Sequence, residues 1–294
     1  MNIFRNFFPT ASAFLHLRML FSVFLMPVFL FALSQVPQIN LQNTVLTFII
    51  WHLLVYPASN GYNSYFDKDE GSIALIETPP PVDKSLYNFS LFLDILALLL
   101  ALYVGWILFF AVLFYGVVSK MYSHPTFRFK KYPLLSFLIV FIFQGAFVYW
   151  STYASISGLY TLEGWNLNFI LAGLICSCLI GATYPLTQVY QHKEDSNRGD
   201  KTLSIVLGIR GSFYFSALLF LFSSILLYFY WYRLEMSTNF LIFLALASPV
   251  FILFSNWFFA VYHDPSKANF KNMSRMTLLS SIMMLIYFGL LNII

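Results

Sequence analysis

Long apolar runs alternate with short polar segments along this chain of 294 residues. The apolar runs cover 13–36, 43–66, 86–103, 105–122, 133–155, 166–190, 204–230, 238–261 and 274–294. A helix that crosses a bilayer core of roughly 30 Å needs about 20 mostly apolar residues. The pattern therefore predicts an all-α, polytopic membrane protein with nine transmembrane helices, in a single domain over residues 1–294. Because 86–122 is too long for one span, we place a reversal of direction at Gly105.

The composition excludes several classes of protein. Hydrophobic residues make up 60% of the chain, charged residues 10%, and the mean hydropathy is +0.75. A soluble domain usually carries about 25% charged residues, and a disordered chain combines low hydrophobicity with high net charge. A nucleic-acid binder gathers its basic residues on one soluble face. We therefore expect an integral membrane protein with no nucleic-acid partner.

The positions of the basic residues predict the orientation of the helices. When loops are assigned to alternate sides of the nine spans, all of the 16 Lys and Arg residues except Arg233 fall on one side. Such an excess marks the cytoplasmic side. We expect a cytoplasmic N-terminus and an outer C-terminus, in a bacterial inner (plasma) membrane. The inner loops are also the longer and more charged ones, which places the chemistry and the mouth of the site on the cytoplasmic face.

A polar cluster ends the second apolar run. Asn60, Asn63 and Asp67 are spaced by three and four residues, which places them on one face of a helix. Carboxylate and amide oxygens are ligands for a hard cation such as Mg²⁺. The same pattern also fits an ordinary polar helix end at the membrane surface. Both interpretations remain open for these residues taken alone.

A second polar cluster ends the sixth apolar run. Tyr184, Gln188, Gln191 and Asp195 follow one another at helical spacing and predict a polar stripe that continues the sixth helix. Polar side chains at membrane depth usually face a bundle interior or a wet cavity. Two such helix ends on the same side, four helices apart, suggest an internal duplication with paired sites.

Between the two clusters lies a basic segment from Tyr122 to Pro133. Arg128, Lys130 and Lys131 supply its charge. One interpretation is an anchor to an anionic membrane surface. The other is a phosphate clamp, with Arg128 as a planar fork and Lys130 as a point charge.

The three segments together resemble the UbiA-type intramembrane prenyltransferases. The first motif of that family reads Asn-Asp-x-x-Asp-x-x-x-Asp. This chain keeps Asn63 and Asp67, but Ser64 and Gly71 stand at the other two carboxylate positions. Two neighbouring carboxylates are possible substitutes, Asp69 and Glu70.

The second family motif reads Asp-x-x-x-Asp-x-x-x-Gly-x-x-Thr-Leu. The matching residues here are Asp195, Gly199, Thr202 and Leu203, and Gln191 stands for the first Asp. The basic segment is similar to the Tyr-Ser-x-Pro-Pro-x-Arg-Leu-Lys segment of the family. The order of the three motifs, on the inner ends of the expected helices, supports the resemblance along essentially the whole chain.

The resemblance implies a helical bundle with two motif-bearing halves that hold Mg²⁺ and the diphosphate of an isoprenoid donor. It implies a transferase that moves the isoprenoid to a small acceptor. The implied metal ligands are Asn63, Asp67, Gln191 and Asp195, of which Asp67 and Asp195 are also the catalytic residues. The implied substrate-binding residues are Arg128, Lys130, Tyr122, Asn60, Lys68 and Arg198.

Two other functions remain as alternatives. The substitutions at Ser64, Gly71 and Gln191 also fit a family member that binds or moves an isoprenoid or other membrane lipid without turnover. A secondary transporter fits less well, because transporter sites usually lie near the bilayer midplane, whereas these motifs lie at helix ends.

Overall fold

The computed structural model describes residues 9–68, 71–73, 76–158 and 166–293. Within these ranges, nine helical segments are long and apolar enough to cross a membrane. They are Ala11–Gln35, Leu41–Asp67, Lys84–Val104, Trp106–Ser123, Pro133–Ser157, Leu167–Thr187, Leu203–Arg233, Ser237–His263 and Phe270–Leu290. Each predicted apolar run meets one of these segments, so the prediction of nine spans is confirmed.

The chain divides into two compact units, each described here by itself. The first unit contains Met1–Val23, Val36–Phe129 and Ser151–Tyr160, and the second contains Phe24–Gln35, Lys130–Trp150 and Thr161–Ile294. The first and fifth spans therefore each belong partly to one unit and partly to the other. That residues 1–294 act as a single domain stays a prediction of the sequence.

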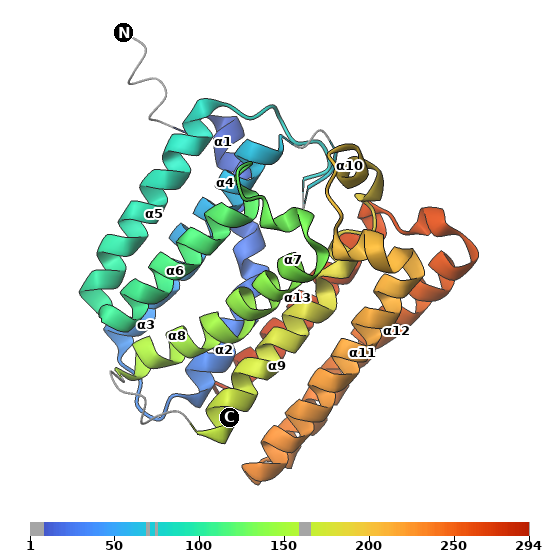
Figure 1. Ribbon diagram of the computed structural model, residues 1–294. Helices are drawn as coiled ribbons and strands as arrows, with labels where there is room; N and C mark the ends of the chain where they lie inside the picture. The colour runs from blue at the N-terminus through green and yellow to red at the C-terminus, as the bar shows by residue number, and fades with distance from the viewer. Residues whose placement is uncertain (1–8, 69–70, 74–75, 159–165, 294) are drawn as a thin grey trace. The chain divides into compact units, whose positions relative to one another are not determined.

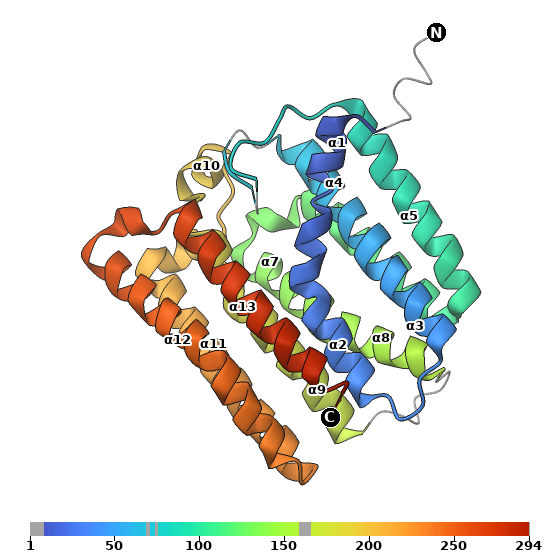
Figure 2. The same ribbon diagram turned by 180° about the vertical axis from the view of Figure 1, so that it is seen from behind.

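The first unit is built around a helix hairpin and the second span. The second span consists of α3 (Leu41–Phe48), a π-helical segment (Ile49–Val55) and α4 (Tyr56–Asp67). Helix α4 packs against α5 (Lys84–Val104) and α6 (Trp106–Ser123), which also pack against each other (Figure 1). The short α1 (Ala11–His16) lies against α4 and α5 (Figure 2).

The predicted reversal at Gly105 is confirmed. This residue ends α5 and begins α6 with φ 154° and ψ 164°. That backbone conformation is essentially restricted to glycine, because a Cβ atom would clash with the neighbouring peptide groups. A single residue can therefore join two antiparallel spans, where a longer polar loop would otherwise be needed.

The second unit contains the longest helices. Helix α9 (Leu167–Thr183) packs against α11 (Leu203–Arg233), and α12 (Ser237–His263) pairs with α13 (Phe270–Leu290). Helix α13 also packs against α2 (Met26–Gln35). Around Phe31 of α2 the core is aromatic, with ring centroids 4.7–6.4 Å away in Tyr149, Tyr230, Trp231 and Phe288. The fifth span begins with α7 (Pro133–Val140) and ends with α8 (Phe147–Ser157). The short α10 (His192–Asn197) follows the sixth span.

Polar caps start several of these helices. Asn40, Asp83, Asn166 and Asn269 each precede a helix, and the side chain of each accepts a hydrogen bond from a backbone N–H of the first turn. The first N–H groups of a helix have no partner inside the helix, and Asn and Asp are among the preferred residues for this position. Short polar segments between apolar runs therefore define where the spans begin.

The sixth span ends earlier than the sequence suggests. Helix α9 stops at Thr183, a 3₁₀ turn follows at Pro185–Thr187, and α10 begins only at His192. Proline lacks a backbone N–H and its ring crowds the carbonyl of the preceding turn, which breaks a regular helix. The prediction of one continuous polar stripe on an extended sixth helix is therefore wrong. Asp195 instead belongs to a separate short helix, and Gln191 directly precedes that helix.

Candidate functional site

The polar face of α4 forms the candidate site in the first unit. Asn60, Asn63 and Asp67 all lie on this helix and are all half-buried, as their spacing predicts. Asn63 Nδ2 donates a hydrogen bond to Ser123 Oγ over 2.8 Å and so links α4 to the end of α6. Asn60 Nδ2 donates to the backbone oxygen of Leu17 over 3.4 Å. These hydrogen bonds hold both amide groups in place through their nitrogen atoms. Each amide also carries an oxygen that can serve as a ligand.

The end of α4 gives Asp67 a fixed position. Asp67 is the last helical residue, and the exposed Lys68 follows with a left-handed φ of 49°. The backbone N–H of Lys68 donates to Ser64 O over 3.0 Å, which closes the final turn. The Ser64 side chain is buried, with 1% exposed, and its hydroxyl has no hydrogen-bond partner among the described residues.

Arg18, a cation within the first predicted apolar run, lies beside this face of α4. Arg18 Nη2 donates to the backbone oxygen of Asn60 over 3.2 Å. Arg18 sits at the break between α1 and the 3₁₀ segment Met19–Leu25, with φ 48°. An arginine inside a predicted span was the only signal in the sequence for this contact, since ionisable residues at membrane depth usually have a partner.

An ion pair joins α5 and α6 in the same unit. Asp94 Oδ2 lies 2.5 Å from Lys120 Nζ, and both side chains are less than one-fifth exposed. The Lys120 ammonium also lies 5.1 Å from the centroid of the Tyr62 ring on α4. The pair therefore links α5 and α6 beside α4, the helix that carries the first motif. Asp94 falls within the predicted apolar run 86–103, and no local pattern in the sequence identifies Lys120 as its partner.

The second unit carries the candidate residues on and around α10. Gln191 precedes the helix, and its backbone oxygen accepts a hydrogen bond from Asp195 N over 2.9 Å. Arg198 at the end of α10 forms an ion pair with Glu194, one helical turn earlier. This half-buried ion pair uses part of the Arg198 charge that was expected to bind the substrate.

A glycine at the family position ends α10. Gly199 has φ 76°, in the left-handed region that favours glycine after a helix. This turn allows the backbone N–H of Asp200 to donate to Asp195 O over 2.9 Å. The chain reverses tightly there and enters α11 three residues later.

Hydrogen bonds also connect α10 to the start of α11. His192 Nε2 lies 2.7 Å from Ser204 Oγ, and Ser204 N donates to Gln188 Oε1 over 3.3 Å. Burial disfavours the charged imidazole and lowers the pKa of His192. These contacts fix the segment that presents Gln191 and Asp195.

The basic segment spans the boundary between the two units. Tyr122 on α6 and Arg128 belong to the first unit, and Arg128 is half-buried with φ 44°. Lys130 belongs to the second unit, where it is buried and its Nζ lies 3.7 Å from Asp200 Oδ2.

The neighbouring lysine has a different environment. Lys131 Nζ lies 4.9 Å from the ring centroid of Tyr132, whose side chain is 48% exposed. An amphipathic lysine–tyrosine pair at the surface fits a membrane anchor. The inward position of Lys130 fits a binding role instead, so the two interpretations of the segment apply to different residues.

The predicted residues therefore form two sets. The first unit holds Asn60, Asn63, Asp67, Lys68, Tyr122 and Arg128, and the second holds Lys130, Gln191, Asp195 and Arg198. The possible substitutes Asp69 and Glu70 lie outside the described residues. In the described ranges, no three His, Cys, Asp or Glu side chains converge as a metal cluster. Each set offers hard oxygen donors, namely one carboxylate and at least one amide.

Comparisons with known proteins bear on the family and the fold. The model of the UbiA prenyltransferase family matches residues 20–282 of the chain. A search of curated protein sequences finds no match.

Several solved structures share the fold. A UbiA homologue from Archaeoglobus fulgidus bound to DMAPP and Mg²⁺ has a TM-score of 0.69 and 17% identity, with 97% of this chain and 100% of that chain covered. The same homologue bound to GPP and Mg²⁺ gives a TM-score of 0.68 at 17% identity and the same coverage. A structure described for digeranylgeranylglyceryl phosphate synthase in membranes gives 0.61 and 18%, with 96% and 98% covered.

Proposed function

The chain belongs to the UbiA prenyltransferase family, whose members transfer prenyl groups, and we propose that it transfers an isoprenoid from an allylic diphosphate to a small acceptor. The observation that carries the proposal is that each unit presents a carboxylate beside an amide. Asp67 lies one turn from Asn63 on α4, and Asp195 accompanies Gln191 at α10. Solved structures of the same fold contain DMAPP or GPP together with Mg²⁺, which supports this class of donor.

The donor atoms of both sets suit Mg²⁺. This ion prefers oxygen ligands and is usually held by one or two carboxylates together with substrate phosphates and water. A single carboxylate in each set satisfies that requirement without a preformed cluster of three acidic residues. We propose that Asn63 and Asp67, and separately Gln191 and Asp195, hold Mg²⁺ when the diphosphate is present.

The reaction breaks the bond between the allylic carbon and the diphosphate oxygen. The electron pair leaves with pyrophosphate, and an electron-rich atom of the acceptor forms the new bond to the allylic carbon and then loses its proton. Bound Mg²⁺ supplies positive charge against the departing oxygens. Arg128 and Lys130 stabilise the same developing charge, since fixed cations are most effective where charge accumulates. Tyr122, Asn60, Lys68 and Arg198 complete the proposed substrate contacts.

Pyrophosphate release tests the proposal. Purified protein in lipid, supplied with Mg²⁺, allylic diphosphates of several lengths and a membrane extract as a source of acceptors, is expected to release pyrophosphate. Asp67→Ala and Asp195→Ala should each lower the rate by at least about 100-fold, because each removes a carboxylate proposed to hold the Mg²⁺ that stabilises the leaving group. Chelation of Mg²⁺ with EDTA should abolish release.

A matched control is Asp264→Ala. Asp264 is an exposed carboxylate 3.7 Å from Lys267, between α12 and α13, and belongs to neither set. Its loss should leave the rate unchanged. Absence of release with every donor, or release that survives both motif substitutions, would contradict the transferase proposal.

The alternative is a family member that binds an isoprenoid diphosphate without turnover. It is favoured by Ser64 and Gln191, neutral residues at positions where the family pattern has carboxylates. Direct binding of geranyl diphosphate without pyrophosphate release under any condition would support this alternative over catalysis.

A further inference from the structure

One buried ion pair stands out among the charged residues. Of all the Lys, Arg, Asp and Glu residues in the described ranges, only Lys130 and Asp200 are buried, with 9% and 3% of their surface exposed. They contact each other, since Lys130 Nζ lies 3.7 Å from Asp200 Oδ2. The two belong to the same unit. Asp200 occupies a position that the second family motif leaves unspecified.

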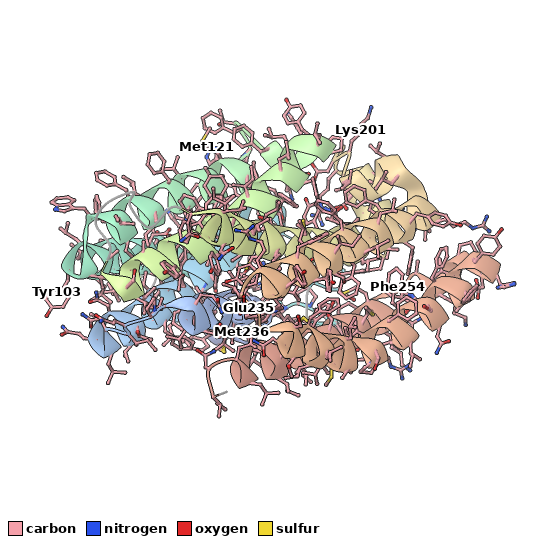
Figure 3. All side chains as sticks on the ribbon, turned by 90° about the horizontal axis from the view of Figure 1, so that it is seen from below. Tyr103, Met121, Lys201, Glu235, Met236 and Phe254 are labelled. Atoms are coloured by element: carbon pink, nitrogen blue, oxygen red, sulfur yellow. The ribbon has the colours of Figure 1, made fainter. Side chains whose placement is uncertain are left out.

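Burial of this pair needs a physical reason. Removing an ion from water costs several kcal/mol, and a partner of opposite charge offsets that cost only in part. A lysine side chain is long enough to carry its ammonium to water instead. Lys131 and Lys201 behave in that way, because Lys131 packs on the exposed Tyr132 and Lys201 projects from the surface (Figure 3). Lys130 alone among these lysines points inward.

The backbone fixes the carboxylate that holds Lys130. Asp200 follows Gly199, whose left-handed turn ends α10, and its N–H donates to Asp195 O over 2.9 Å. Two residues later Thr202 precedes α11. The position of Asp200 therefore depends on the same turn that carries Asp195. A separation of 3.7 Å between Nζ and Oδ2 exceeds a hydrogen-bond distance, so charge attraction links these two atoms.

We propose that Asp200 is a positioning residue that holds the Lys130 ammonium at the second motif, ready to bind the diphosphate of the donor. The proposal rests on the proposed function, in which Lys130 binds that diphosphate. Without Asp200, the buried Lys130 ammonium would lose the carboxylate that lies 3.7 Å from it and would turn toward water. The donor would then lose a cation from its binding site, while the residues that bind metal would be unaffected.

Donor binding measures this role directly. Geranyl diphosphate with Mg²⁺ is titrated into the protein in lipid nanodiscs to give Kd, and pyrophosphate release in the presence of the membrane extract that supplies acceptors gives KM and kcat. Asp200→Asn should raise Kd and KM about tenfold, because the buried Lys130 ammonium loses the negative charge that lies 3.7 Å from it. The value of kcat should change less than about threefold, since the interaction acts in the ground state as well as the transition state. Asp200→Glu, which keeps the carboxylate, should restore Kd to within about threefold of the wild-type value.

Two further variants separate positioning from simple stabilisation. Asp264→Asn makes the same substitution in an exposed ion pair with Lys267 and should leave Kd unchanged. The exchanged pair, Lys130→Asp with Asp200→Lys, should recover the thermal stability lost in Asp200→Lys but not the donor affinity. If the pair were only structural, Asp200→Asn would reduce the active fraction and kcat with KM unchanged, and that result would overturn the proposal.

The results that would contradict the positioning role of Asp200 differ from the results that would contradict the proposed function. If the wild-type protein binds geranyl diphosphate but releases no pyrophosphate, the transferase proposal fails and the Kd comparison still decides the role of Asp200. If Asp200→Asn binds the donor as tightly as the wild type, the positioning role is wrong even when turnover is intact. If the wild type neither binds nor turns over any of the allylic diphosphates, both proposals are wrong.

Discussion

Single side chains set the charge that the candidate site can present to a metal. Two of the four proposed ligands, Asn63 and Gln191, are amides, which bring an oxygen but no negative charge. Ser64 stands at a further carboxylate position and is buried at 1% exposure. Fewer charges lower the attraction for divalent ions, because ligand charge is one of the main determinants of affinity. The residues present therefore predict a site that holds Mg²⁺ weakly until the diphosphate contributes its own oxygens.

Restoring a carboxylate at Gln191 tests that prediction. Gln191 is half-buried at the start of α10, so a charge there is not fully desolvated. Gln191→Asp should lower the Mg²⁺ concentration for half-maximal pyrophosphate release by about tenfold, which corresponds to about 1.4 kcal/mol. The measurement is a Mg²⁺ titration at saturating donor.

The control is Gln42→Asp, the addition of the same charge at an exposed amide near the start of α3. It should leave the Mg²⁺ requirement unchanged. A requirement that does not fall in Gln191→Asp would show that position 191 does not face the metal. The buried Ser64 is a poorer place for this experiment, because a new charge there would be largely removed from water.

Sequence spacing could predict part of this site. The intervals between Asn60, Asn63 and Asp67 require only the geometry of one helix, and the structure places all three on α4. The hydrogen bond from Asn63 to Ser123 connects residues that are 60 positions apart in the sequence. The ion pair between Lys130 and Asp200 connects residues that are still farther apart. Such contacts depend on how helices pack, which no local pattern specifies. The proposed ligand and substrate roles stay predictions.

At the scale of the helices, most of the candidate polar residues lie at or beside a helix end. The apolar runs predicted the nine spans because a fixed bilayer thickness imposes their length. The sixth span shows the limit of that argument, since hydropathy continues through 190 while Pro185 ends the regular helix. Hydropathy measures partition into lipid and not backbone hydrogen bonding. A proline near the end of an apolar run is the signal that the prediction needed.

The cap of α5 makes a prediction about stability and pH. Asp83 accepts hydrogen bonds from the backbone N–H and the hydroxyl of Ser85, over 2.7 and 2.5 Å, and from Thr10 Oγ1 over 2.6 Å. Partial burial raises the pKa of Asp83, but these hydrogen bonds outweigh it and hold the pKa below its usual value. The stabilisation is therefore present above the ordinary pKa of about 4 and is lost as pH falls through the lower, folded value.

Thermal unfolding of Asp83→Ala in detergent measures this contribution. At neutral pH the variant should be less stable by about 1 kcal/mol, since an N-cap is lost. The difference in melting temperature should shrink as the pH falls below the folded pKa of Asp83. Asp83→Asn keeps a capping oxygen without the charge, so it should lose less stability at neutral pH. A gap that is equally large at neutral and acid pH would contradict the role assigned to the ionised carboxylate.

At the scale of the whole molecule, the distribution of charge predicts how the chain crosses the membrane. The structure provides nine candidate spans in its described ranges, and an odd number places the two termini on opposite sides. The fold alone does not distinguish inside from outside. That choice rests on the Lys and Arg residues, of which only Arg233 lies on the proposed outer side. We propose that the N-terminus and both motifs face the cytoplasm.

Cysteine labelling in intact cells tests this orientation. The native Cys176 and Cys178 are buried on α9, which keeps their background reaction with a membrane-impermeant maleimide low. Tyr103 and Met236 are exposed at 70% and 47% and lie at the proposed outer ends of α5 and α12 (Figure 3). Tyr103→Cys and Met236→Cys should react when the reagent is added outside the cells.

Two exposed lysines on the opposite side complete the comparison. Lys201 lies in the loop before α11, and Lys271 lies in the first turn of α13. Both positions are on the side proposed to face the cytoplasm, and each is changed to cysteine in turn. They should react only after the cells are opened, because the reagent cannot cross the bilayer. Labelling of the lysine positions in intact cells, with protection at 103 and 236, would reverse the orientation. It would also place both motifs on the outer face, because they lie on the same side as Lys201 and Lys271 in the proposed orientation.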